Sequence, residues 1–305
     1  MPVLLSCSLA LWLFVAVLGE LNVGAESNAD LSCNVVTRVL ALLCYMSVAL
    51  LLNSLHLFER RVSWLLSIYL WFVALSTFVQ YDLNVALPSA LLLVSLSVLF
   101  SCQLVQEPER RLFAAFFIIG SASFYIPLLF VFLPFMVAFT VMANVLTAKR
   151  FMAMLLGLVT PFWMVAGTAY VYSPASILFH RIGGFFASIP VGLSLPPIHV
   201  MLFMAAELLS LVPAFAYFAV SSSPGKPLLR RRLLFVMVFN ACTMLLSFVF
   251  HSQSELLYAC TLPGTAIMFS YVFTLKMTRF SNIYFIFVNI IWIALASYCL
   301  WMDLF

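Results

Sequence analysis

Hydrophobic runs of about 20 residues, separated by short polar turns, make up almost the whole chain. A transmembrane helix needs about 20 apolar residues to cross a hydrocarbon core of ~30 Å, so each run predicts one span. The runs are apolar on all sides instead of alternating with polar residues, which excludes a transmembrane β-barrel. Nine single spans are predicted, at 2–19, 35–58, 62–79, 84–105, 151–172, 198–220, 233–250, 256–275 and 282–301.

One run does not fit a single span. The 37 residues 112–148 carry no charge and lie between two basic pairs, Arg110-Arg111 and Lys149-Arg150. As one helix they would extend about 55 Å, far more than the hydrocarbon core. The pattern therefore predicts a hairpin of two short helices that turns within 120–127 and returns the chain to the side it left. A re-entrant loop is the alternative.

The distribution of basic residues selects the hairpin. With eleven spans and a cytoplasmic N-terminus, 12 of the 14 Lys and Arg residues fall on the cytoplasmic side, and only Arg38 and Arg181 do not. Merging the hairpin into one span leaves at best 9 of 14 inside. Because basic loops tend to stay cytoplasmic, we expect eleven spans with the C-terminus outside.

Composition agrees with this architecture. The 305 residues are 66% hydrophobic and only 8% charged, whereas a soluble domain carries about 25% charged residues. No stretch is polar enough for a soluble domain, so we expect residues 1–305 to form a single all-α, polytopic transmembrane helical bundle of about 11 spans. The net charge of +4 lies in the predicted loops, and no nucleic-acid partner is expected.

Two segments leave alternatives open. The run 2–19 could be a cleaved signal peptide, but no basic residue precedes it, which favours a retained helix. The connection 173–197 has apolar residues on one helical face and His180 and Arg181 on the other, a pattern typical of a helix lying in the membrane interface. Those two side chains could bind an anion such as a lipid pyrophosphate, or Arg181 could extend to the interface.

Glu207 is the main candidate for chemistry. It lies about ten residues from each end of its run, near the bilayer midplane, where a charged carboxylate costs at least ~2.5 kcal/mol. Asn240 lies at a similar depth in 233–250, and Thr243 and Ser247 continue its helical face. We expect a direct contact between Glu207 and Asn240. It could be a functional site or a hydrogen bond that holds two helices together.

Other polar residues give weaker signals. On the outer side His180, His199 and His251 could bind a metal, but carboxylates at useful spacing are missing, so no metal site and no cofactor are predicted. Glu20, Glu26 and Asp30 could supply a catalytic acid or form an ordinary solvated loop. The hairpin turn at 124–127 could line a cavity or simply be packed. The chain has no phosphate loop and no recognised nucleophile motif, and its seven cysteines are read as packing residues.

Three stretches carry a family resemblance: LFERRVSWLLSIYLW, QEPERRLFAAFFIIGSASFYIPLLF and LLGLVTPFW. The sequence between about Asn53 and Tyr172 resembles an uncharacterised polytopic inner-membrane family of the Bacteroidota. This segment is some 40% of the chain. Members of the family are about 300 residues long and are described only as a domain of unknown function. The resemblance implies a multi-pass protein of the bacterial inner membrane, and it transfers no functional residue.

Three functions remain open from the sequence, and whether the protein is an enzyme is among the open questions. The first is a non-catalytic membrane component that acts through partners such as other membrane proteins. The second is a glycosyltransferase or polymerase acting on polyprenyl-linked sugars, suggested by the acidic first outer loop and by Arg181. The third is a transporter that uses Glu207. In each case the lipid bilayer is the surrounding partner.

Overall fold

A computed structural model describes residues 28–54, 63–76, 78–79, 82–104, 107–172, 195–220, 227–274 and 279–304. Helices account for nearly all of these residues, which contain no strand. The α-helices are α2 (Asn28–Ser54), α3 (Ser63–Leu75), α4 (Leu83–Ser101), α5 (Pro108–Tyr125), α6 (Leu133–Met142), α7 (Ala148–Tyr172), α9 (Ile198–Val220), α10 (Pro227–Val249), α11 (Ser254–Thr274) and α12 (Arg279–Leu304). Three short 3₁₀ helices join them, η1 (Cys102–Leu104), η2 (Pro127–Phe132) and η3 (His251–Gln253).

Five of these helices are long and apolar enough to cross a membrane, judged by length and composition. The five apolar segments are Leu83–Ser101, Ala148–Thr168, Ile198–Ala216, Leu229–Val249 and Asn282–Cys299. Shorter apolar helices cover Thr37–Leu52, Leu65–Leu75 and Pro127–Met142. The predicted all-helical class is therefore confirmed for the described residues, together with several candidate membrane helices. The count of eleven spans stays a prediction, and the run 2–19 lies outside the described residues.

Several helix boundaries differ from the predicted ones. α9 matches its predicted range, but α5, α7 and α10 each begin three to six residues early, inside what the charge pattern presented as basic loops. Both α5 and α10 start with proline, whose fixed φ suits the first helical position and whose missing N–H is not needed there. Charged residues at these ends extend the helix beyond its apolar part, so polarity alone placed the boundaries too late.

Contacts divide the described chain into two compact units. Unit 1 comprises residues up to Leu87 and from Leu193 onward, and unit 2 comprises Pro88–Gly192. The prediction of a single membrane domain concerns how the units sit together in the bilayer, and it stays a prediction.

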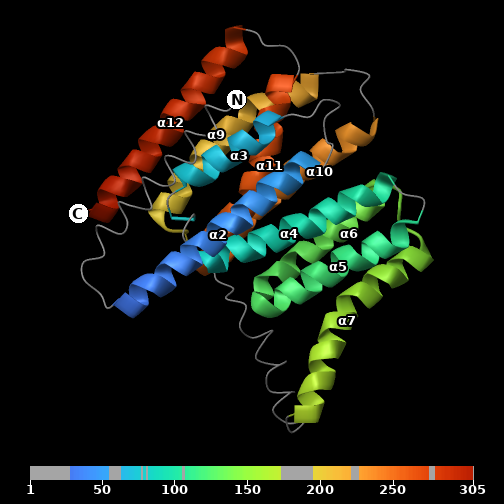
Figure 1. Ribbon diagram of the computed structural model, residues 1–305. Helices are drawn as coiled ribbons and strands as arrows, with labels where there is room; N and C mark the ends of the chain where they lie inside the picture. The colour runs from blue at the N-terminus through green and yellow to red at the C-terminus, as the bar shows by residue number, and fades with distance from the viewer. Residues whose placement is uncertain are drawn as a thin grey trace. The chain divides into compact units, whose positions relative to one another are not determined.

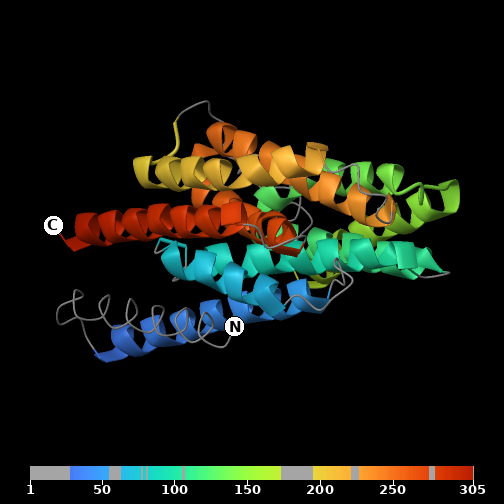
Figure 2. The same ribbon diagram turned by 90° about the horizontal axis from the view of Figure 1, so that it is seen from above.

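Helix α11 is the centre of unit 1. Every residue from 256 to 271 is buried, and α11 packs against α3, α9 and α10 while α12 packs against α3 and α9 (Figures 1 and 2). Aromatic rings fill the space between four of these helices. The Phe72 ring of α3 stacks on Trp292 of α12 at 4.5 Å and meets Phe269 of α11 at 5.5 Å. Such a helix, apolar all round, is suited to the middle of a bundle.

The outward faces of unit 1 are apolar. α9 and α12 expose large aliphatic and aromatic side chains, among them Ile198, Leu208, Val212, Ile286 and Ile290. A soluble protein rarely exposes so much contiguous apolar surface. Because lipid tails can cover such faces, this exposure agrees with a membrane-embedded helix bundle.

Unit 2 contains the predicted hairpin. α5 ends at Tyr125, Ile126 is extended (φ −131°, ψ 108°), and η2 begins at Pro127. Proline disfavours helical geometry at the residue before it, which explains why the helix breaks at Ile126. The break falls inside the predicted window 120–127. The hairpin also packs on α4, because Ser95 Oγ donates to Ala115 O at 2.7 Å and the rings of Phe100 and Phe139 lie 4.8 Å apart.

Helix α7 packs closely on the first arm of the hairpin. A Cβ atom on Gly157 of α7 would lie 2.4 Å from the carbonyl oxygen of Phe113, so the two backbones almost touch. Gly120 of α5 faces Pro161 of α7 in the same seam, with an added Cβ 3.1 Å from Pro161 Cγ. Small residues that let backbones approach are typical of membrane helix pairs. Figure 1 shows α7 bending along its length, and Pro161 lies inside the helix, as expected for a proline kink.

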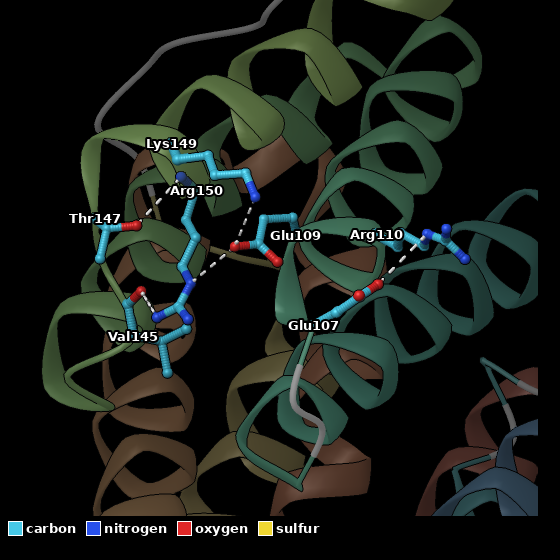
Figure 3. A network of polar contacts seen from close by, with 7 residues as sticks. All are labelled: Glu107, Glu109, Arg110, Val145, Thr147, Lys149 and Arg150. Atoms are coloured by element: carbon cyan, nitrogen blue, oxygen red, sulfur yellow. Dashed lines mark hydrogen bonds and ion pairs between the residues drawn. The ribbon is translucent and has the colours of Figure 1, made fainter.

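The base of the hairpin is a network of charges (Figure 3). Glu109 at the start of α5 lies 3.5 Å from Arg150 Nε and 3.8 Å from Lys149 Nζ at the start of α7. Arg150 Nη1 also donates to Val145 O at 2.9 Å, just after α6. Both basic ends of the 112–148 run therefore meet at one place. A single continuous helix would hold them about 55 Å apart, so the chain does turn back.

Candidate functional site

Glu207 lies at the middle of α9. It is nine residues from either end of the apolar segment Ile198–Ala216, and its side chain is completely buried. No Lys, Arg or His forms an ion pair with it among the residues that the structure describes. A carboxyl group at this depth must therefore be neutral, or be stabilised by hydrogen bonds or a bound cation.

Two threonines of α11 contact the carboxyl group of Glu207. Thr261 Oγ1 donates to Oε2 at 2.9 Å, and Thr265 Oγ1 donates to Oε1. The two threonines are four residues apart and so share one face of α11. Both carboxyl oxygens are thus engaged by hydroxyl groups from a single neighbouring helix.

Asn240 joins the same site from α10. Its Nδ2 donates to Thr265 Oγ1 at 3.1 Å, whereas its buried Oδ1 has no hydrogen-bond partner among the described residues. Gly264 makes room for this amide, because a Cβ atom there would lie 2.2 Å from Asn240 Oδ1. We call Glu207, Asn240, Thr261 and Thr265 the Glu207 cluster.

Where a direct contact between Glu207 and Asn240 was predicted, the described residues show a hydrogen-bonded link through Thr265. Thr265 bridges the two side chains, since α11 packs against both α9 and α10 at this level. The helices α9 and α10 do approach elsewhere, where Ser247 Oγ lies 3.3 Å from Met204 Sδ. Sequence neighbours were expected to be packing neighbours, and a third, later helix supplies the actual partners.

Further hydrogen bonds fix the backbone around Glu207. Ser210 Oγ donates to the carbonyl oxygen of Glu207 at 2.7 Å, and Tyr284 of α12 donates its hydroxyl to Ser210 O. One turn before Thr261, the hydroxyl of Tyr258 bonds with Ser76 Oγ at 3.0 Å. α9 is therefore tied to both α11 and α12 near the carboxyl group.

A second polar contact lies at the N-terminal ends of α9 and α11. His199 Nε2 is 3.4 Å from Glu255 Oε1, and both side chains are more than a third exposed. The ring of Phe78 packs on His199 at 5.1 Å. Glu207 is eight residues further along α9, about 12 Å away. This pair is thus an accessible polar contact on the same helix as the buried carboxyl group.

Of the other predicted site residues, only some lie in the part of the chain that the structure describes. His180 and Arg181, with Glu20 and Glu26, lie outside the described residues, so the interfacial anion site and the glycosyltransferase hypothesis stay predictions. Asp30 falls in the first turn of α2, not in a loop. No three His, Cys, Asp or Glu side chains gather as a metal site would require within the described ranges. Five cysteines are free thiols: Cys44, Cys102, Cys242, Cys260 and Cys299.

The hairpin turn is packed. The ring of Phe162 on α7 lies 4.4 Å from that of Phe124 and 5.5 Å from that of Phe130, one on each side of the turn. Aromatic contacts at these distances are favourable and leave little open space. The turn therefore resembles a packed corner more than the wall of a cavity.

Neither Thr261 nor Thr265 was predicted from the sequence. A signal was present, since two threonines four residues apart flank Pro263-Gly264 in an otherwise apolar run. Isolated threonines are common in membrane helices, however, so only their position against Glu207 identifies them.

Compared with known protein families, with curated proteins and with solved structures, the chain has no match.

Proposed function

We propose that the chain is a multi-pass transporter of the bacterial inner membrane, coupled to a cation that Glu207 binds. One observation carries this proposal: a fully buried carboxyl group at mid-span, engaged by two hydroxyl groups and without a basic partner in the described part of the chain. Ionisable residues inside the membrane are costly and usually mark ion or proton pathways. A cation taken up at Glu207 would cancel that cost.

The cluster spans three helices, which suits coupling. α9 supplies the carboxyl group, α11 the hydroxyl groups and α10 the amide. A change in the charge of Glu207 alters hydrogen bonds to α11 directly and to α10 through Thr265. Binding of an ion at such a junction can therefore bias how the helices pack, which is the requirement for coupling binding to a conformational change.

A non-catalytic membrane component that acts through partners is the second candidate. It is favoured by the same hydrogen bonds, because both carboxyl oxygens already have donors and Glu207 therefore ties α9 to α11. Buried polar contacts of this kind stabilise membrane helix pairs by about 0.6–2 kcal/mol. In this case Glu207 needs only its shape and hydrogen bonds, not its charge.

Substitution of Glu207 by Gln separates the two candidates. Glutamine keeps the size, accepts a hydrogen bond from one threonine and donates one to the other, but it cannot bind a cation by charge. We expect Glu207→Gln to reach the membrane at normal levels. We expect it to fail to restore the wild-type phenotype of a strain lacking the gene. Glu107→Gln, which changes an exposed carboxylate, is the matched control and should restore it. Restoration by Glu207→Gln would favour the partner-dependent component.

The proposal includes a topology. Eleven spans, a cytoplasmic N-terminus and a periplasmic C-terminus place Lys149 and Arg150 inside together with Arg110 and Arg111. The charge network that joins the two ends of the hairpin supports this arrangement, because residues in direct contact at helix ends lie on one side of a membrane. The bacterial inner membrane follows from the resemblance to the Bacteroidota family, which is itself part of the proposal.

A further inference from the structure

We infer that the ion bound at Glu207 is a proton, and that Thr261 and Thr265 are hydroxyl switches that satisfy the carboxyl group in both charge states. The inference rests on the proposed function in naming the coupling ion. Its own basis is geometric, because each of the two hydroxyl groups has two acceptors within reach.

The two acceptors of each threonine are a carboxyl oxygen and a backbone carbonyl. Thr261 Oγ1 lies 2.9 Å from Glu207 Oε2 and 2.7 Å from the carbonyl oxygen of Tyr258. Thr265 Oγ1 contacts Glu207 Oε1 and lies 3.1 Å from the carbonyl oxygen of Thr261. A hydroxyl group has one proton to donate, so each threonine must choose between them.

In the charged state both hydroxyl groups donate to the carboxylate. Oε1 then accepts from Thr265 and Oε2 from Thr261, and Asn240 Nδ2 donates to the lone pair of Thr265 Oγ1. The carbonyl oxygens of Tyr258 and Thr261 keep their places in the helix. Hydrogen bonds to the charged form of a carboxyl group stabilise that form, so burial alone does not forbid it.

In the neutral state one hydroxyl group turns away. The proton adds to Oε2 and forms an O–H bond, which donates to Thr261 Oγ1, while Thr261 donates to Tyr258 O instead. Oε1 still accepts from Thr265. If the proton adds to Oε1 instead, its O–H donates to Thr265 Oγ1 and Thr265 donates to Thr261 O. No heavy atom has to move and no donor is lost. Release breaks the same O–H bond and returns the proton to water, so no other reactant is required.

The groups that face Glu207 favour a proton over Na⁺ as the bound ion. α11 contributes Tyr258 and the two threonines, α12 contributes Tyr284 through Ser210, and α10 contributes Asn240, with Arg232 eight residues or about 12 Å before it. The oxygens of the cluster lie at hydrogen-bond distance from one another, which a bound Na⁺ would have to separate.

Infrared spectroscopy of the purified protein in lipid tests the inference directly. The carbonyl-stretch band of a protonated carboxylic acid should appear and disappear as the pH is varied from about 4 to about 9, and this band should be absent in Glu207→Gln. Thr265→Val should displace the pH midpoint of the band by about one unit, since it removes one hydrogen bond to the carboxyl group. Thr265→Ser, which keeps the hydroxyl group, should not.

The outcomes are decisive in either direction. A Glu207 band that never titrates in this range would overturn the inference, and so would equal midpoints in Thr265→Val and Thr265→Ser. Replacing choline chloride by NaCl at constant pH should leave the band unchanged, and its loss would identify Na⁺ as the ion instead. The proposed function fails separately: a titrating band combined with a functional Glu207→Gln variant would establish a proton site that transport does not use.

Discussion

Single residues show where this chain has no room for change. Gly157 and Gly264 both stand where any side chain would strike a neighbouring helix, but the obstacle differs. At Gly157 it is the backbone carbonyl of Phe113, 2.4 Å from an added Cβ, and at Gly264 it is the amide of Asn240, 2.2 Å away. Backbone cannot yield without moving the whole helix, whereas a side chain can rotate.

This difference predicts two distinct responses to alanine. Gly157→Ala should destabilise the protein by about 2 kcal/mol or more, because overpacking costs typically 1–3 kcal/mol, and no single second substitution should restore it. Gly264→Ala should cost a similar amount, but in the Asn240→Ala background most of the cost should vanish. Gly167→Ala is the control, since no atom lies within 4 Å of its added Cβ and alanine favours a helix.

Thermal unfolding in detergent measures these effects, with a double-mutant cycle for the second pair. Additive losses for Gly264→Ala and Asn240→Ala would mean that the amide does not occupy the space the glycine leaves. An unchanged melting temperature for Gly157→Ala would mean that α5 and α7 do not pack through this seam.

At this scale the sequence identified Glu207 and Asn240 but not the two threonines that contact the carboxyl group. Glu207 stands out because a lone acid in an apolar run is costly wherever it lies. Its partners depend on which helix packs against it and at what height, and neither is encoded in a local pattern. Thr265 could have been named only by knowing that α11 packs against both α9 and α10.

Helices were predicted better than their ends. The runs of apolar residues matched ten described helices, and five of these are long and apolar enough to cross a membrane. α5 and α10 begin earlier than predicted, at Pro108 and Pro227 within the charged flanks, because backbone hydrogen bonding continues where hydrophobicity stops. The break at Ile126 was predictable because proline acts on its neighbour through local sterics alone.

The contact between α5 and α7 predicts a response to pH. A hydrogen bond from its own backbone N–H holds the pKa of Glu109 below its ordinary value of 4.5, and Lys149 and Arg150 add to the effect. A lowered carboxyl pKa gives stability that is fully present above the unfolded pKa and is lost as the pH falls through the folded one. We therefore expect the hairpin base to weaken below about pH 4.5 and not above it.

Comparison of two variants separates the pH-dependent stability that Glu109 contributes from that of other carboxylates. The melting temperature of the wild type should exceed that of Glu109→Gln at neutral pH, and the difference should shrink toward zero as the pH falls from 4.5 through the lowered pKa of Glu109. Glu107→Gln changes a largely exposed carboxylate two residues away and should show little difference at any pH. A wild-type advantage over Glu109→Gln that persists undiminished in acid would refute the role of the charge.

For the whole molecule, the side of the membrane on which each loop lies depends on the hairpin. If both of its arms cross, every later loop keeps the side that the basic residues favour. If the arms merge, every later loop changes side. Glu109 touching Lys149 and Arg150 supports the first case, and the protein in its membrane tests it.

Cysteine labelling with a membrane-impermeant maleimide provides that test, in a background without the seven native cysteines. Ala148→Cys, exposed at the start of α7, should react only in inverted vesicles, whereas Tyr170→Cys, exposed near the end of α7, should react in intact cells. Ile126→Cys at the turn should also react from outside if both arms span the bilayer.

Protection of Ile126→Cys, with the other two unchanged, would establish a re-entrant hairpin. Every later loop would then keep its side of the membrane, because the chain still returns to its starting side. Reaction of Ala148→Cys from outside would contradict both forms, since the basic ends that meet at Glu109 would then lie in the periplasm against the tendency of such residues to stay inside.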